Sequence, residues 1–398
     1  MITGEVRSAM STPVWLKVGA FLASIGLIAL WVGRGGRLVG SIVIPPEAVV
    51  AFLGVLLLLV VVHEAGHFVT AKMAGVTVKE FGLGYPPRLA SFTFRGTLYS
   101  LNLLPLGGFV KLLGEEDPSE RGSFASRSIP WRLIILGAGP FMNLVLPVAL
   151  IAISLMIPHR SFEGPVYVGQ VAAGSPAEAA GLRPGDVILT VAGRPVHLPQ
   201  DVRYQSMLHL GSEMELTVRR GGDTKMVGLT PRWTPPEGEG PVGITPTMLR
   251  GEAREVVVST PLPEALVEGA RRTADMFTLF KNGIQAAMMG QAEAALSGPI
   301  GIAQATGEVA MRGGLPPLLE WAAFLSLNLA IMNILPIPML DGGRMAFVLL
   351  EWVRRGRRIR PDREGLAHLV GFACLLALVA AVSVVDIQRL LEGGSVIR

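Results

Sequence analysis

The 398-residue sequence is almost without cysteine, and this absence narrows the chemistry open to it. Cys374 is its single cysteine. One cysteine cannot form an internal disulfide, and it excludes metal sites built from cysteine pairs. Cysteine therefore contributes neither an internal crosslink nor a nucleophile, and it leaves the redox compartment open.

Charge is also scarce. Charged residues make up 17% of the chain, whereas a soluble domain carries about a quarter. The balance of 35 Lys and Arg against 31 Asp and Glu, a net charge of +4, is too mild to indicate a nucleic-acid partner. Half of the residues are hydrophobic, and the mean hydropathy is +0.50. The composition therefore predicts a membrane protein, long enough for two or three domain-sized units.

Long apolar runs are abundant, and a membrane-spanning helix needs about 20 such residues. Four runs predict spanning helices, at residues 47–71, 133–157, 321–340 and 366–385. A fifth and shorter run, at residues 18–33, has no cleavage site of the signal-peptide type in the following "WVGRGG". We interpret it as an uncleaved extra helix.

The positions of the basic residues predict the orientation, because Lys and Arg near the ends of spans mark the cytoplasmic side. Eight of them lie between the first two spans, and "RRGRRIRPDR" from Arg354 precedes the last span. Two crossings, by the second and third spans, separate the two links, so both are expected on the cytoplasmic side. We expect a multi-pass protein of the cell membrane (inner or plasma membrane), with residues 159–319 mostly extracytoplasmic.

The segment "PRLASFTFRGTLYSLNLLPLGGFVKLLG" alternates apolar and polar residues on both sides of Arg95 and Gly96. This pattern predicts a β-hairpin. Its apolar character suits a hairpin that lies against the bilayer, where paired backbone is required. Either it is a small structural sheet, or its edge captures an extended peptide by strand addition.

The stretch "VYVGQVAAGSPAEAAGLRPGDVILTVAGRPV" from Val166 resembles a bacterial PDZ domain. It predicts a strand, a helix opened by Ser175 and Pro176, an exit at Gly181 and a strand near Asp186. The resemblance extends through "MELTVRR" and "TKMVGLTP" to "PVGITP" at residues 241–246. One such α/β domain is expected, at residues 159–248.

The apolar run "LLLLVVVHEAGHFVTAKM" contains His63, Glu64 and His67. On a helix, the two histidines lie on one face and Glu64 lies on its edge, the HExxH arrangement in which imidazoles bind Zn²⁺ and glutamate acts as general base. Ionisable groups within a span are costly and usually functional. The alternative is a buried polar trio that holds helices together.

A catalytic zinc takes a third protein ligand and keeps one open position. "NLAIMNILPIPMLDGGRM" offers Asp341 at the end of the third span. Pro336 and Pro338 break the helix, and two glycines follow the aspartate, so the carboxylate is expected on irregular backbone inside the protein. Alone, such an aspartate is usually a helix cap; together with HExxH, it is the best third ligand.

The HEAGH motif at residues 63–67, "GAGPFMN", a single PDZ domain and "NILPIPMLDGG" together resemble the site-2 protease family of intramembrane zinc metalloproteases. The resemblance implies a zinc site made by His63, His67 and Asp341, with Glu64 as the base, facing the cytoplasmic side. It also implies a substrate contact at Asn333 and substrate presentation by the hairpin at residues 88–103. Asn143 is a second candidate substrate contact, and the alternative is that it holds two helices together, as asparagines within spans more often do.

Implied partners are the lipid bilayer and a membrane-protein substrate with a transmembrane helix, such as an anti-sigma factor or a signal-peptide remnant. An upstream site-1-type protease can trim the substrate first.

The predicted fold is a polytopic α-helical membrane protein with a membrane-associated β-hairpin and one inserted PDZ-like domain. The expected plan is an N-terminal extension (1–46), a first transmembrane core (47–158), the PDZ domain (159–248), a linker with amphipathic surface helices (249–319) and a second core (320–398). One rival is a non-catalytic PDZ membrane adaptor, which would not need the intact His, Glu and Asp set. The other is a transporter, which predicts inverted repeats that the sequence does not show.

Overall fold

The computed structural model describes residues 46–391, apart from residues 116, 237, 250, 291–296 and 360. The chain divides into two compact units. The first comprises Met1–Leu146 and Ser297–Arg398, and the second comprises Pro147–Leu296. The extra helix expected at residues 18–33 lies outside the described residues.

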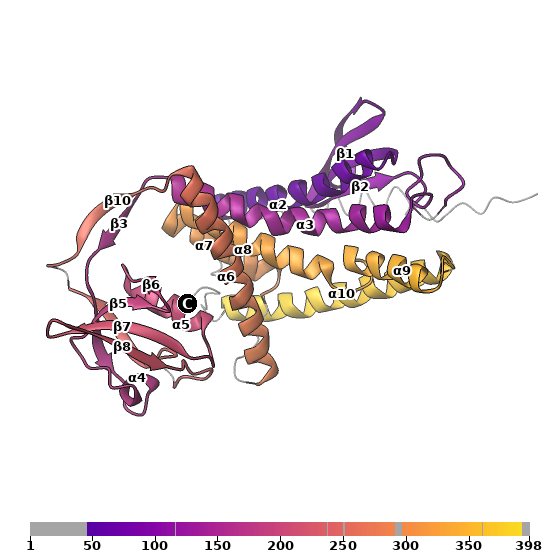
Figure 1. Cartoon of the computed structure of the whole chain (residues 1–398). Coiled ribbons are helices and arrows are strands. Elements are labelled where there is room, and N and C mark those ends of the chain that lie inside the picture. The colour runs from indigo at the N-terminus through magenta and orange to yellow at the C-terminus, as the bar shows by residue number, and fades with distance from the viewer. Residues whose placement is uncertain are drawn as a thin grey trace, which may run out of the picture. The chain divides into compact units, whose positions relative to one another are not determined.

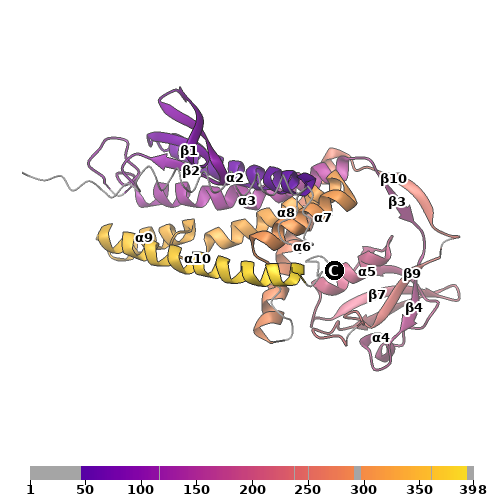
Figure 2. The ribbon, with the colours of Figure 1, turned by 180° about the vertical axis from the view of Figure 1, so that it is seen from behind.

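Four described helices are long and apolar enough to cross a membrane. At 1.5 Å per residue, even the shortest of them, with 20 residues, matches the roughly 30 Å hydrocarbon core of a bilayer. The four predicted spans are thus confirmed as long apolar helices, and Figures 1 and 2 both show α2 beside α3. They are α2 (Pro46–Met73), α3 (Ile129–Met156), α8 (Leu315–Ile334) and α10 (Pro361–Leu391).

The third span ends earlier than predicted, at Ile334 rather than at residue 340. Leu335 already has an extended backbone, because the proline that follows it disfavours the helical conformation. A short irregular segment then leads to a helix that the sequence analysis did not predict, α9 (Asp341–Val353). The predicted break before Asp341 is therefore present, but the expectation that Asp341 itself lies on irregular backbone is wrong, because this residue begins α9.

A small antiparallel sheet follows α2 and consists of β1 (Val78–Phe94) and β2 (Thr97–Leu112). Arg95 and Gly96 form its turn, both with positive φ. Residues 78–83 pair on one side with residues 98–101 and on the other side with residues 108–112. The two long strands thus fold into four short segments, and the outer edges are residues 108–112 and residues 88–94.

A buried ion pair joins the start of α3 to the end of α9. The Arg132 guanidinium donates two hydrogen bonds to the Glu351 carboxylate, at 2.8 and 2.9 Å. Burial by itself would raise the pKa of Glu351, but the hydrogen bonds and charge of Arg132 outweigh it and hold that pKa below its usual value. Arg358 contacts both Glu351 and the backbone carbonyl of Ala125. The loops at this end of the first unit are therefore bound to each other.

Helix α7 (Pro299–Gly313) packs against α2 in the first unit. A Cβ on Gly307 would lie 2.3 Å from the Cβ of Ala48, so the absence of a side chain permits this close approach. At the other end of α7, the Gly301 N–H donates a 2.8 Å hydrogen bond to the buried Asp386 carboxylate of α10. The segment from Ser297, expected as a surface helix, thus forms a helix held by two spanning helices.

The second unit is built around a six-stranded antiparallel sheet with the order β8-β7-β5-β4-β9, in which β6 pairs with β5. Ser175 caps the short α4 by accepting a hydrogen bond from the Glu178 N–H. The strands of the sheet are β4 (Val166–Val171), β5 (Val187–Val191), β6 (Arg194–Pro195), β7 (Met214–Arg220), β8 (Asp223–Leu229) and β9 (Ile244–Met248). The other elements are α4 (Pro176–Ala179), α5 (Pro199–Leu208), the pair β3 (His159–Glu163) and β10 (Arg254–Val258), and α6 (Leu262–Met288).

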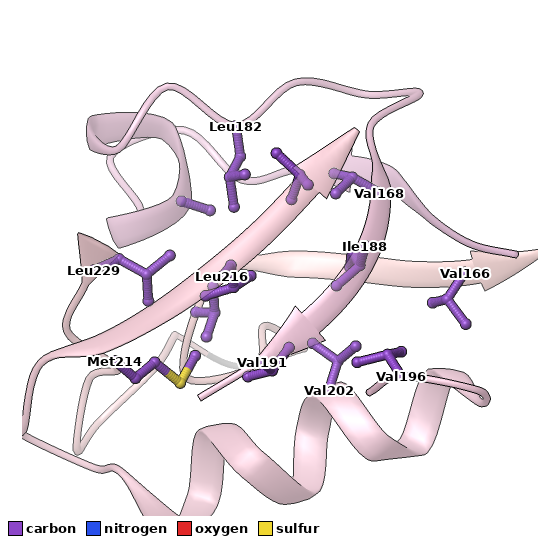
Figure 3. Packing of buried hydrophobic residues seen from close by; sticks show 13 residues of the cluster. Val166, Val168, Leu182, Ile188, Val191, Val196, Val202, Met214, Leu216 and Leu229 are labelled. Atoms are coloured by element: carbon purple, nitrogen blue, oxygen red, sulfur yellow. The ribbon is translucent and has the colours of Figure 1, made fainter. Parts of the chain in front are cut away.

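The core of this unit comes from inward-facing strand residues and one face of α5. Val191, Val202 and Leu216 are at most 2% exposed and gather between the strands and the neighbouring helix (Figure 3). The buried residues of β7 are Met214, Leu216 and Val218, every second residue, as expected for a strand with one buried face.

Candidate functional site

His63 and His67 lie one turn apart on α2 and are both buried. Their Nε2 atoms are 3.2 Å apart, and the ring centroids are 4.9 Å apart in an edge-to-face arrangement. The spacing of four residues places both rings on one face of the helix. The two nitrogens therefore point to a common position beside α2.

Asp341 is brought to the same position by the break between α8 and α9. Its Oδ2 lies 3.0 Å from His63 Nε2 and 3.2 Å from His67 Nε2. A Cβ on Gly342 would lie 2.3 Å from the carbonyl oxygen of Ile334, and one on Gly343 would lie 2.2 Å from that of Ile337. Only glycine fits at these positions, because the start of α9 lies against the end of α8 and the irregular segment that follows it.

These three side chains fit a zinc ion. Their ligand atoms lie within 4.8 Å of one another. Zinc held tetrahedrally at about 2.0–2.1 Å separates its ligand atoms by roughly 3.3 Å, close to the 3.0–3.2 Å found between these three atoms. Two imidazoles and one carboxylate also form a known catalytic zinc set.

A cavity of about 530 Å³ opens beside the three ligand atoms, so one side of the metal position faces open space. Glu64 lies in its wall, as do Tyr85, Asn333 and Arg344. Glu64 follows His63 directly, and its carboxylate is not among the three clustered ligand atoms. The arrangement therefore offers a carboxylate beside an open metal position.

The small sheet forms another part of this wall. Gly107, Gly108, Phe109 and Val110, at the 108–112 edge and just before it, line the cavity. A Cβ on Gly108 would lie 2.9 Å from Glu64 Cγ, so this glycine permits close contact between the sheet and α2. The residues expected to present substrate were 88–103, yet the edge beside Glu64 belongs to a later segment of the same sheet.

Helix α3 contacts the outer nitrogen of each histidine. His67 Nδ1 lies 2.7 Å from the carbonyl oxygen of Ile135, and His63 Nδ1 lies 3.2 Å from Asn143 Nδ2. Asn143 is fully buried and does not line the cavity, whereas Asn333 lines it from the last turn of α8. Of the two asparagines expected to contact substrate, only Asn333 thus has access to the cavity.

Two glycines that the sequence analysis did not single out bring α2 and α3 together. A Cβ on Gly66 would lie 2.4 Å from the carbonyl oxygen of Ala138, and one on Gly139 would lie 2.3 Å from His67 Nε2. Both belong to quoted motifs, HEAGH and GAGPFMN. The sequence therefore contained a signal for this helix contact, because small residues in spanning helices allow two helices to approach closely.

We expect Gly139→Ala to lower zinc affinity at least about tenfold, because the new methyl group would displace the ligand nitrogens of both histidines. Chelator competition on the purified protein measures this loss. Gly137→Ala is the matched control, since its Cβ would meet the nearest atom, Met345 Cε, at an ordinary 3.7 Å. Equal zinc affinity in the two variants would contradict the close approach of α3 to the histidines.

Comparison with known proteins agrees with the geometry. Residues 51–378 match the model of peptidase family M50. A protein of Clostridium acetobutylicum named as a zinc metalloprotease is 35% identical over 346 residues, which cover 85% of this chain and 96% of that protein. Zinc metalloprotease RasP of Oceanobacillus iheyensis is 30% identical, over 86% of this chain and 99% of its own length.

The regulator of sigma-W protease RasP of Bacillus subtilis is 28% identical, again over 86% of this chain and 99% of its own length. The match to the family model covers most of the chain, including the part of α2 that contains the two histidines and the start of α9 with Asp341. The chain therefore belongs to peptidase family M50, the site-2 protease family, and is a membrane zinc metalloprotease.

Proposed function

We propose that this metalloprotease hydrolyses peptide bonds in or beside the transmembrane segments of membrane proteins, with His63, His67 and Asp341 as its zinc ligands. The observation that carries this proposal is the convergence of three ligand atoms, one of them on the first residue of α9, next to helices long enough to span a bilayer. The name of the Bacillus subtilis relative refers to a sigma-factor regulator. We infer regulated intramembrane proteolysis, with substrates of the anti-sigma factor or signal-peptide remnant type.

In this reaction, a bound zinc ion supplies Lewis acidity to the water and to the scissile carbonyl. Glu64 removes a proton from the attacking water as the new C–O bond forms. It then delivers that proton to the amide nitrogen as the C–N bond breaks, so that an amine and a carboxylic acid result. Asn333 lines the cavity wall, and in this proposal it would hydrogen-bond the substrate backbone near this bond.

We propose that the substrate adds as a strand to the 108–112 edge of the small sheet. A transmembrane helix hides its carbonyls in its own hydrogen bonds and must unwind before water can attack. A sheet edge stabilises the unwound segment by accepting and donating backbone hydrogen bonds. Among the described residues, only the 78–83 segment pairs with 108–112, and this edge adjoins Glu64.

We expect benzoylphenylalanine at Phe109, in a Glu64→Gln background, to cross-link a transmembrane reporter on illumination. The same photoprobe at Phe92 is the matched control, because Phe92 lies on the opposite edge of the sheet and is 66% exposed. Mass spectrometry identifies the linked peptide. Cross-linking through Phe92 alone would instead assign substrate presentation to the 88–94 edge.

The proposed orientation puts the metal site toward the cytoplasm and the sheet unit, which we take as the PDZ domain, outside the cell membrane. The basic links at residues 72–132 and 354–363 both carry the cytoplasmic signal. A contact between them supports a common side, since Arg358 donates a hydrogen bond to the carbonyl oxygen of Ala125.

We expect an impermeant thiol reagent to label a cysteine at Lys225 and not one at Arg357 when applied to intact cells. Both positions are exposed, and the background carries Cys374→Ala so that no other thiol reacts. Labelling of both after permeabilisation serves as the control. The reverse pattern in intact cells would overturn the proposed orientation.

The proposed PDZ domain would select substrates rather than take part in the chemistry, since the proposed orientation puts it across the membrane from the metal site. A folded domain near the substrate entrance would exclude membrane proteins with bulky ectodomains. Substrates would then have to be trimmed first by an upstream site-1-type protease.

Metal analysis of the purified protein, together with cleavage of transmembrane reporters in proteoliposomes, tests the proposed function. We expect about one zinc per chain and cleavage within or beside the reporter's membrane segment, faster for a reporter without an ectodomain. A protein that folds and binds PDZ ligands but neither binds zinc nor cleaves any reporter would be the non-catalytic adaptor instead. Equal cleavage of trimmed and untrimmed reporters would refute selection while leaving the protease assignment intact.

A further inference from the structure

Asn143 is a buried side chain beside the metal site without an assigned chemical task in the reaction. It lies on α3 and is 0% exposed. Its backbone carbonyl accepts a 2.8 Å hydrogen bond from Ser326 Oγ on α8, and its side-chain amide lies 3.2 Å from His63 Nδ1. Its Oδ1 is buried, and no described residue donates a hydrogen bond to it. Both the orphan oxygen and the contact with a ligand histidine call for an explanation.

The position of the proton on the His63 ring supplies an explanation. A neutral imidazole carries its proton on one nitrogen and has a lone pair on the other. If Nε2 of His63 donates its lone pair to zinc, as the proposed site requires, the proton must sit on Nδ1. A buried N–H needs an acceptor. For His67, the carbonyl of Ile135 is that acceptor, at 2.7 Å. For His63, the neighbouring polar group is the Asn143 amide.

The two ends of an amide have the same shape, so the positions of its oxygen and nitrogen are inferred from hydrogen bonding. With Nδ2 toward the ring, Nδ1 of His63 would accept, and the ring proton would sit on Nε2, which lies 3.0 Å from Asp341 Oδ2 at the metal position. That tautomer cannot bind zinc. If the amide is turned, its oxygen leaves a position where no described residue donates to it and instead faces the N–H at His63 Nδ1.

We propose that Asn143 turns its amide oxygen toward His63 Nδ1 and holds that ring in the tautomer whose Nε2 binds zinc. Asn143 is thus a positioning residue that acts through His63, and the inference rests on the proposed zinc site. A residue that only held α3 against its neighbours would affect the stability of the protein and leave its zinc affinity unchanged.

The test measures the zinc affinity of the full-length protein in detergent, by chelator competition, for two substitutions of opposite character. Asn143→Leu keeps the size and removes the acceptor, so we expect a 10–100-fold loss of affinity. Asn143→Asp keeps an acceptor and has no amide donor, so we expect wild-type affinity or tighter binding. Zinc affinity in Asn143→Asp as low as in Asn143→Leu would show that an acceptor at this position does not favour the zinc-binding tautomer, and that result would overturn the proposal.

Three controls separate the possible causes. Ser326→Ala removes the neighbouring bond between α8 and α3 without touching the ring, so its zinc affinity should equal that of the wild type. Unchanged affinity in a folded Asn143→Leu protein, with affinity lost in His63→Ala, would refute the role of Asn143 alone. Unchanged affinity in His63→Ala would refute the zinc site itself, and this inference with it. If Asn143→Leu does not fold, as judged by thermal unfolding, the affinity of Asn143→Asp decides.

Discussion

Glu64→Gln should abolish measurable proteolysis while the protein keeps its zinc. Glutamine has almost the same size as glutamate, but it cannot take a proton from water at neutral pH. A positioned general base contributes roughly 10²–10⁴-fold to such a reaction. The carboxylate lines the cavity and is not one of the three clustered ligand atoms, so its neutralisation should leave metal binding intact. Reporter cleavage and zinc content of the same preparation measure the two effects.

The matched control for this variant is Glu47→Gln, at the other end of α2, where the carboxylate is exposed. It should cleave the reporter at the wild-type rate. Wild-type cleavage by Glu64→Gln would remove Glu64 from the mechanism and leave the cavity without a base at the metal position.

Asp341→Ala should lose both proteolysis and most of its zinc. The substitution removes one of three ligand atoms and leaves two imidazoles, which cannot complete the site. Loss of a group that merely orients a ligand costs 10–100-fold in metal affinity, so loss of the ligand itself should cost at least about 100-fold. Chelator competition and metal analysis give the affinity, and the reporter assay gives the activity.

Asp223→Ala, on the exposed start of β8, serves as the control for loss of an aspartate. Full zinc occupancy in Asp341→Ala would exclude this carboxylate as a ligand, even if activity were lost. The comparison with Glu64→Gln then distinguishes the two roles, because loss of the base should leave the zinc content unchanged, whereas loss of a ligand should lower it.

Much of this site could be predicted from the sequence because its first part is local. His63 and His67 are four residues apart, and helical periodicity alone places them on one face. The spanning helices are equally local, since 20 or more apolar residues in succession suffice to predict each one. Asp341 came from its motif, "NILPIPMLDGG", and the structure brings it to 3.0 Å from His63 across 278 positions of sequence.

Other features depended on the packing of elements that no local pattern relates. The hairpin was predicted from its alternation, but which edge lies beside Glu64 depends on how β1 and β2 double back, and this edge is 108–112 rather than 88–94. Likewise, Asn143 was expected from the sequence as a substrate contact, and only its approach to His63 indicates a role beside the metal.

By itself, the sequence determined the membrane setting, the histidine pair with its glutamate and the helix break before Asp341. Hydropathy, helical periodicity and the effect of proline on the backbone each depend on a few neighbouring residues. The tertiary structure alone decided the distances among the three ligands, the open side of the metal position and the partner of each outer histidine nitrogen. These depend on how closely α2, α3 and α8 approach, and Gly66, Gly139 and Gly342 permit that approach only in the packed molecule.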